Sequence, residues 1–231
     1  MITNTTSAYR RGLLAAAAAL ILLSGCGRRD NTAAGSSADA PPPRPAAAES
    51  ASASAPAGAS SEESGDAELE SAADALLADM AAGDFEAVSA WADPRRGVTF
   101  TPYSTVNPQA DYTATAEELA QFSADPAVRT WGIYDGSGEP IRMTAAEYWA
   151  RFVWNTDYTK APDVSVNTAA QSGNSPENAA DAYPDAQFVE YHFSSLDPQY
   201  GGADWCALKL VFVRQNGAWK LRGIIHSEMT L

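Results

Sequence analysis

The two histidines of the chain each stand two residues from a carboxylate. Glu190 and His192 alternate in Val189-Glu-Tyr-His-Phe193, and His226 precedes Glu228 at the same spacing. Side chains two apart in a strand share a face, so each imidazole has a carboxylate beside it that can orient it for acid–base chemistry. We expect either that the two pairs converge in one concave pocket or that each is a solvated polar face of a half-buried strand. A metal site needs three or four converging ligands, so none is expected here.

Tyr103 and Asp135 are two further candidates for acid–base chemistry. Asp135 opens Asp135-Gly-Ser-Gly-Glu139, which superficially resembles a calcium loop. The segment lacks the alternating Asp or Asn ligands and the bidentate Glu that such loops require. A turn is the better interpretation of this segment.

Ligand binding is the other chemistry that the sequence suggests. The Gly-rich stretch 197–205 is either a wide turn or a recognition loop at a pocket rim, where Tyr200, Asp204 and Trp205 offer stacking and hydrogen bonds. Trp131 belongs to a run of aromatic residues that we expect mostly in the core, with some lining a pocket. The sequence contains no nucleophile elbow, Walker loop, dinucleotide fingerprint or Cys-x-x-Cys, so we expect no cofactor.

Cys26 is the residue whose chemistry the sequence indicates most directly. Residues 1–12 carry Arg10 and Arg11, residues 13–23 are all apolar, and Ser24 and Gly25 precede the cysteine. This is the layout of an export signal, and eleven apolar residues are too few to span a bilayer, which needs roughly 20. The alternatives are a secretory signal with an incidental cysteine, or a short buried helix.

The segment resembles the signal peptide and lipobox of bacterial lipoproteins. The resemblance implies that residues 1–25 are removed and that Cys26 becomes the mature N-terminus, carrying a diacylglyceryl thioether with chains such as palmitate. We therefore expect an exported protein held at the cell membrane, or at the outer membrane if the cell has one. Cys206, the other cysteine, would then have no disulfide partner, and we expect it to be a small buried side chain.

A linker and one domain are expected to follow. In residues 27–66, 29 of the 40 residues are Ala, Ser, Gly or Pro, and Leu, Ile, Val, Met and aromatic residues are missing. Such a segment cannot bury enough apolar surface to fold. Residues 67–231 hold 10 Lys and Arg against 23 Asp and Glu. That charge argues against binding of nucleic acid or anionic lipid through a basic surface.

Helices are expected in the first half of the domain. One apolar stripe follows helical spacing: Leu69, Ala73, Leu76, Leu77 and Met80. Gly83 should end this helix, and Asp84 should cap a short one that follows it. Two capping boxes, Thr115-x-x-Glu118 and Thr144-x-x-Glu147, predict two more helices.

Strands are expected in the second half and between the helices. The expected strands are 98–103, 130–135, 140–143, 164–167, 186–193, 208–213 and 219–227. Asn216-Gly217 is the pair favoured in a type I′ turn and predicts a hairpin between the last two strands. Helices followed by a mostly antiparallel sheet give an α+β fold.

The element order resembles the nuclear transport factor 2-like superfamily, through the Gly83-Asp-Phe-Glu-Ala-Val88 element and the closing hairpin. The resemblance implies N-terminal helices packed into a curved, cone-like sheet. In addition, Phe100–Asn107, Thr130–Gly138, Asp197–Trp205 and Gly223–His226 resemble a group of bacterial lipoproteins with no assigned activity. Together these imply a noncatalytic envelope module that binds a small ligand, a wall component or another envelope protein. The alternative is a lyase, isomerase or hydrolase that uses an acid/base pair inside the cone.

Overall fold

The structure is a computed structural model that describes residues 59–170 and 173–230. The signal segment, Cys26 and the expected linker up to residue 58 lie outside the described residues. The first helix, α1 (Ala59–Ala82), begins eight residues before the expected start of the domain at residue 67. Its bounds show that the Ser- and Glu-rich stretch 59–66 continues the helix toward the N-terminus. None of the described helices is long and apolar enough to cross a membrane.

The end of α1 and the start of α2 lie where the local signals predict. The whole stripe from Leu69 to Met80 is buried, and Gly83 stands just after α1 with a φ of 65°, a conformation that glycine adopts without strain. Asp84 caps α2 (Phe85–Ala90) by accepting a hydrogen bond from the backbone N–H of Ala87 at 3.0 Å.

Both predicted capping boxes are present. Thr115 and Glu118 form the box of α3 (Ala116–Ala120), and Thr144 and Glu147 form that of α4 (Ala145–Tyr148). α4 continues without a break into a π-helical turn, η1 (Trp149–Val153). Shorter elements are η2 (Tyr158–Lys160), α5 (Ala179–Ala182) and η3 (Pro198–Tyr200).

Six strands form the main sheet, in the order β2-β1-β8-β7-β6-β5. Their bounds are β1 Val98–Thr101, β2 Tyr112–Ala114, β5 Asp163–Val166, β6 Gln187–Phe193, β7 Cys206–Gln215 and β8 Ala218–Glu228. All neighbours are antiparallel except β1 and β8, which are parallel. β3 (Arg129–Ile133) and β4 (Pro140–Met143) form a separate hairpin, as predicted from the turn between them.

One strand prediction needs correction, and one strand of the sheet was missed. The first strand ends at Thr101 and not at Tyr103, because the chain turns away at Pro102, which cannot donate to a ladder. The short strand β2 was not predicted. The closing hairpin is confirmed, and Asn216 and Gly217 both have positive φ, 51° and 82°, as a type I′ turn requires.

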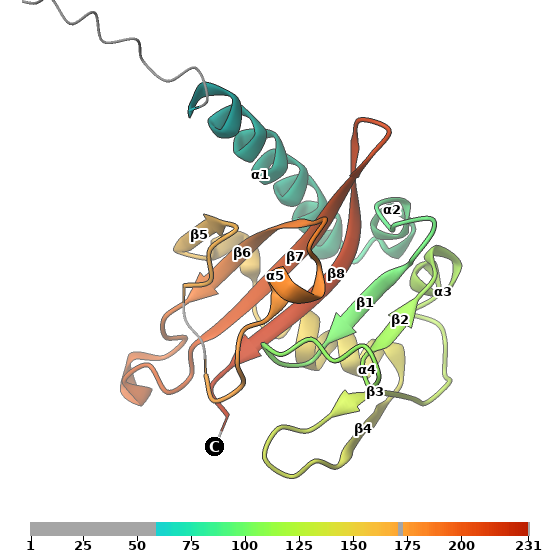
Figure 1. Ribbon diagram of the computed structural model, residues 1–231. Helices are drawn as coiled ribbons and strands as arrows, with labels where there is room; N and C mark the ends of the chain where they lie inside the picture. The colour runs from blue at the N-terminus through green and yellow to red at the C-terminus, as the bar shows by residue number, and fades with distance from the viewer. Residues whose placement is uncertain (1–58, 171–172, 231) are drawn as a thin grey trace, which may run out of the picture. The chain divides into compact units, whose positions relative to one another are not determined.

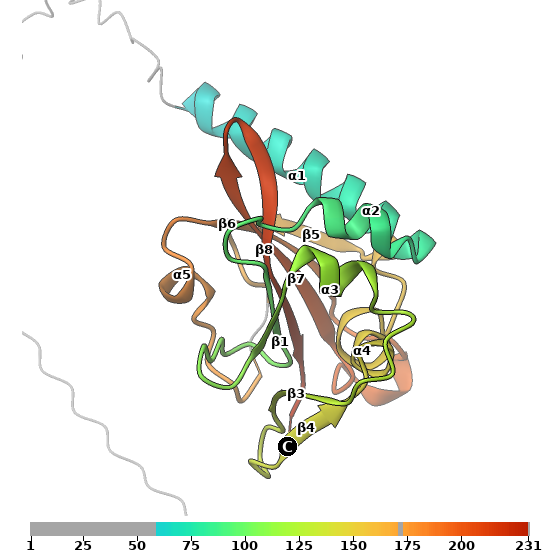
Figure 2. The ribbon, with the colours of Figure 1, turned by 90° about the vertical axis from the view of Figure 1, so that its right-hand side faces the viewer.

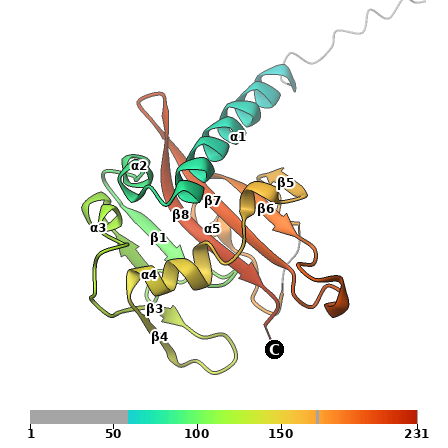
Figure 3. The same cartoon turned by 180° about the vertical axis from the view of Figure 1, so that it is seen from behind.

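The sheet is covered on both faces. α5 lies against one face, which we call the α5 face and which is turned toward the viewer in Figure 1. The helices α1 and α4 lie against the opposite face, which we call the helical face (Figure 3). Seen from the side, the sheet is curved and runs between the two layers (Figure 2). The α+β class with helices packed on a curved, mostly antiparallel sheet is thus confirmed.

Aromatic side chains fill the space between the helices and the sheet. Trp131 stacks on Tyr148 with ring centroids 4.2 Å apart, and Phe100 meets Trp131 edge-on at 5.6 Å. Phe122 and Phe152 pack against the same group, and all five are almost fully buried. The interior of this layer is therefore a packed core, the role expected for most of the central aromatic residues.

Candidate functional site

The two histidines lie on opposite faces of the sheet. Across the ladders, Tyr191 faces Leu208 and Leu208 faces His226, so these three share the helical face. His192 and Glu190 alternate with Tyr191 and lie on the α5 face. The expected convergence of both pairs in one pocket is therefore wrong. The alternative, solvated polar faces, is wrong too, because the residues Glu190, His192 and His226 are at most 5% exposed.

His226 is fully buried and contacts Glu228, which is itself paired with the more exposed Arg151. Its Nε2 lies 3.2 Å from Glu228 Oε2, and its ring packs on Phe152 with centroids 5.9 Å apart. Arg151, from η1, donates to both oxygens of Glu228, at 2.6 and 3.1 Å. Burial lowers the pKa of His226, so this imidazole is neutral near pH 7.

Glu228 is the charged centre of this cluster. Burial opposes its ionisation, but the hydrogen bonds from His226 and Arg151 outweigh burial and lower its pKa to about 2. The arrangement fixes the end of β8 to η1. It leaves Glu228 ionised, and both of its oxygens are engaged.

His192 is buried on the α5 face beside Trp205, with ring centroids 6.1 Å apart. Its nearest charged partner is Asp163 on β5, 3.6 Å from Nδ1. Neither ring nitrogen has a hydrogen-bond partner among the described residues. His192 is therefore a packed side chain at the sheet, and Glu190 beside it has different partners.

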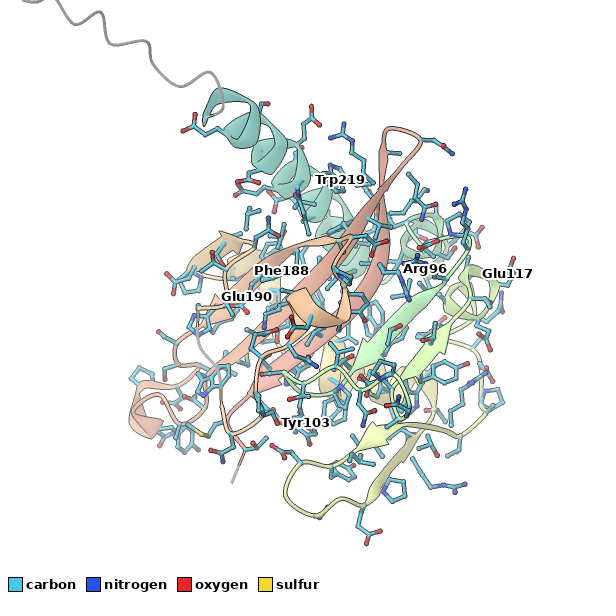
Figure 4. All side chains as sticks on the ribbon, viewed as in Figure 1. Arg96, Tyr103, Glu117, Phe188, Glu190 and Trp219 are labelled. Atoms are coloured by element: carbon cyan, nitrogen blue, oxygen red, sulfur yellow. The ribbon has the colours of Figure 1, made fainter. Side chains whose placement is uncertain are left out.

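Glu190 is part of an ion cluster around Lys209, which the sequence analysis missed. Lys209 stands directly opposite Glu190 in the β6–β7 ladder, and both side chains are fully buried. Lys209 Nζ lies 2.9 Å from Glu190 Oε2, contacts Glu177 Oε2 and donates to Ser227 Oγ at 3.5 Å. We call Lys209, Glu190, Glu177 and Ser227 the lysine cluster. Figure 4 shows Glu190 next to Phe188 on the face that α5 covers.

A serine beside a lysine can serve as a nucleophile and its base, and Ser104 donates to Ser227 at 3.0 Å. Here three acceptors surround the ammonium of Lys209, so its protons are engaged. The sequence did carry a signal for this cluster. In Ala207-Leu-Lys-Leu-Val211 both faces of the strand are apolar apart from Lys209, which is typical of a strand buried on both sides.

An open cleft of about 410 Å³ brings together Tyr103 and Asp135, two of the predicted site residues. Its walls are the loop after β1, the β3–β4 turn and the segment 174–176. Figure 4 shows Tyr103 beyond the end of β1, well apart from Glu190. The exposed or half-exposed side chains of the cleft are mostly polar or aromatic: Tyr103, Thr105, Asn107, Asp111, Tyr134, Asp135, Asn174 and Ser175, with Ile133 and Pro176 as the aliphatic members. Among the described residues, those that line it include no Lys, Arg or His.

Asp135 holds the walls of the cleft together. Its Oδ2 accepts hydrogen bonds from Ser175 Oγ at 2.8 Å and from Thr230 Oγ1 at 2.5 Å. These two bonds lower the pKa of Asp135, so it is ionised at neutral pH. Tyr134 and Gly138 close the predicted turn through a backbone hydrogen bond of 2.9 Å.

Asp111 is a cleft residue that sequence reasoning did not find. Its Oδ2 accepts from Thr101 Oγ1 at 2.7 Å and from the backbone N–H of Asn107 at 2.9 Å. Burial outweighs these bonds and raises its pKa to about 6. A carboxyl group with a raised pKa in a cleft is a candidate for binding or proton transfer. In the sequence, Asp111 follows Pro108-Gln-Ala110 and reads as one more turn residue.

The other predicted ligand residues lie elsewhere. Trp131 is buried in the core, where Nε1 donates to the carbonyl of Met143 at 2.9 Å. Trp205 is 1% exposed, so it does not stand at a rim. Asp204 accepts hydrogen bonds from Ser195, Leu196 and Asp197 and so shapes its own loop. Tyr200 is exposed on that loop, and Cys206 is buried, as expected.

No group of three or more His, Cys, Asp or Glu that could hold a metal ion occurs within residues 59–170 and 173–230. The comparisons add little to the assignment of the site. No protein-family model and no curated protein matches the sequence.

Two solved structures have a similar course of the chain. One is assigned as a calcium/calmodulin dependent protein kinase II association domain from Xanthomonas campestris, with a TM-score of 0.32 and 12% identity over 70% of this chain and 86% of that one. The other is the CaMKII hub homology domain of Chlamydomonas reinhardtii, with a TM-score of 0.34 and 14% identity over 72% and 98%. Because both TM-scores are low, the site is interpreted from its own residues.

Proposed function

We propose that this chain is a lipid-anchored envelope protein whose domain binds a saccharide of the cell wall in the cleft at Tyr103. The anchor would be the lipid on Cys26, and the residues before α1 would act as a tether. The observation that carries the binding proposal is the composition of the cleft, which combines two half-exposed tyrosines with amides and carboxyls and has no cationic side chain.

That composition favours an uncharged, hydroxyl-rich ligand. Tyr103 and Tyr134 offer aromatic faces to the apolar side of a sugar ring, and an aromatic residue with a polar group suits such amphipathic surfaces. Asn107, Asn174 and the carboxyls of Asp111 and Asp135 provide donors and acceptors that fix orientation. An anionic ligand would meet ionised Asp135 with no compensating cation in the cleft.

The binding proposal is tested with neutral oligosaccharides of N-acetylglucosamine, titrated into the detergent-solubilised full-length protein by calorimetry, and with soluble peptidoglycan fragments, whose carboxylates should make them bind more weakly. We expect saturable binding that weakens at least 10-fold in Tyr134→Ala. Tyr200→Ala, which removes an exposed tyrosine outside the cleft, is the matched control and should bind like the wild type. Absence of binding to both probes, or full binding by Tyr134→Ala, contradicts the proposal.

Catalysis in the same cleft is the second candidate, favoured by the raised pKa of Asp111 close to Tyr103. An enzyme would convert the bound oligosaccharide, and new reducing ends would appear with time. Asp111→Asn would abolish that release while the probe still binds. Binding without release of product supports the noncatalytic module.

The anchor is tested separately by Cys26→Ser. The wild-type protein should remain in the membrane fraction after a salt wash and should yield a diacylglyceryl-modified N-terminal peptide by mass spectrometry. Cys26→Ser should lose both properties, whereas Cys206→Ser, the control, should keep them. A Cys26→Ser protein that still partitions with membranes after the wash would exclude the lipid anchor.

A further inference from the structure

The lysine cluster contains the groups for a covalent cross-link between two distant parts of the chain. Lys209 lies on β7, Glu190 on β6 and Glu177 in the segment that covers the α5 face. Lys209 Nζ contacts a carboxylate oxygen of each glutamate. An amine held against two carboxyl groups away from water is a geometry suited to amide formation.

The surroundings keep this amine and these carboxyls in place. Lys209 and Glu190 are fully buried, and Glu177 is 25% exposed. The remaining oxygens are held as well, since Glu190 Oε1 accepts from the backbone N–H of Ala170 at 2.6 Å and Glu177 Oε1 from that of Ala179 at 2.7 Å. The ring of Phe188 lies 5.9 Å from Nζ. Fixed reacting groups of this kind react with effective molarities of about 10⁵ M or more.

We propose that Lys209 and Glu177 condense to an intramolecular isopeptide bond, with Glu190 as the proton carrier. Glu190 takes a proton from the Lys209 ammonium and passes it to a carboxylate oxygen of Glu177. The free amine then attacks Cδ of Glu177, a second proton moves from nitrogen to that oxygen, and the oxygen leaves as water. One N–C bond forms, one C–O bond breaks, and Glu190 ends as the carboxylate it was.

The exposure of the two glutamates decides which of them forms the bond. Glu177 reaches the surface, so the water that leaves has a path to solvent. Glu190 is sealed within the sheet and stands directly across from Lys209, where it can accept the N–H of the new amide. Condensation also removes two charges that are costly to bury.

The bond is tested by mass spectrometry of tryptic peptides from the natural full-length protein. Trypsin cleaves after Lys and Arg, and residues 161–214 contain only Lys209 and Arg214 as such sites. We expect the peptide 161–214 uncut at Lys209 and lighter by one water. A second digestion after Phe188 and Tyr191 should yield two fragments that remain joined through Glu177 and Lys209.

Lys160, which pairs with Asp157 at 2.8 Å on the surface, is the internal control and should be cleaved normally. Glu190→Gln should fold, as judged by circular dichroism, and give peptides 161–209 and 210–214 at full mass. Cleavage after Lys209 in the wild-type protein, with both peptides at full mass, overturns the proposal. A cross-link that persists in Glu190→Gln overturns the role of Glu190 as proton carrier.

Discussion

Replacing Glu228 by glutamine is expected to lower the free energy of unfolding at pH 7 by about 2–3 kcal/mol. The value follows from the pKa of Glu228, which falls from an ordinary 4.5 to about 2, at about 1.4 kcal/mol for each pH unit. The side chain is 20% exposed, so solvent screens the interaction only in part. Glutamine has nearly the same shape but keeps only one acceptor oxygen for Arg151, so the variant removes the charge and one of the two hydrogen bonds.

The pH dependence of this loss follows from the direction of the shift. The folded state holds Glu228 ionised at a lower pH than the unfolded state does. Its stabilising contribution is therefore complete above about pH 4.5 and disappears as the pH falls toward 2. The difference between wild type and Glu228→Gln should be constant from pH 5 to 8 and should shrink steadily below that range.

Urea denaturation followed by tryptophan fluorescence at pH 3, 5 and 7 measures this difference. The matched control is Glu139→Gln, the same chemical change at an exposed turn residue, which should alter the free energy by less than about 0.5 kcal/mol. A cost for Glu228→Gln no larger than that of the control would refute the reasoning. So would a cost of the same size at pH 3 and pH 7.

Three further changes test other parts of the structure. Asp111→Asn should raise the free energy of unfolding by about 1–2 kcal/mol at pH 8 and should leave it nearly unchanged at pH 3.5. Burial raises the pKa of Asp111 to about 6, and only its ionised form is destabilised by burial. Chemical denaturation at the two pH values measures this difference. Gly132→Ala should lower the Tm by several degrees, since Gly132 has a φ of 147° and a Cβ would lie 3.0 Å from Pro102 Cγ. Gly65→Ala is the control and should raise the Tm slightly, because a Cβ at this position of α1 has no atom within 4 Å. Thr144→Ala should cost about 1 kcal/mol, because it removes the capping box of α4, and calorimetry should show the loss.

The elements predicted correctly from the sequence are those whose signals are local. The capping boxes at Thr115 and Thr144, the end of α1 at Gly83 and the turn at Asn216-Gly217 each depend on residues a few positions apart. The parallel pairing of β1 with β8 and the short strand β2 depend on partners distant in sequence. The alternation of apolar and polar residues within one strand carries no information about which distant strand will pair with it.

The candidate site shows the same division. The alternation of side chains along a strand correctly places Glu190 beside His192 and His226 beside Glu228. It does not show which face of the sheet each pair occupies. That depends on the register across β7, where Leu208 pairs with both Tyr191 and His226. Tyr103 and Asp135 were expected to matter and do meet in one cleft. Asp111 was not expected, because its raised pKa arises from burial by residues of other elements.

The place of β1 between β2 and β8 affects how the domain is made. β1 includes residues 98–101, yet its parallel partner is residues 218–228, so the centre of the sheet stays incomplete until the ribosome has passed residue 228. Contacts between such distant segments slow folding, because a long loop must close before they form. During synthesis, therefore, the helical half of the domain emerges with its apolar stripe still uncovered.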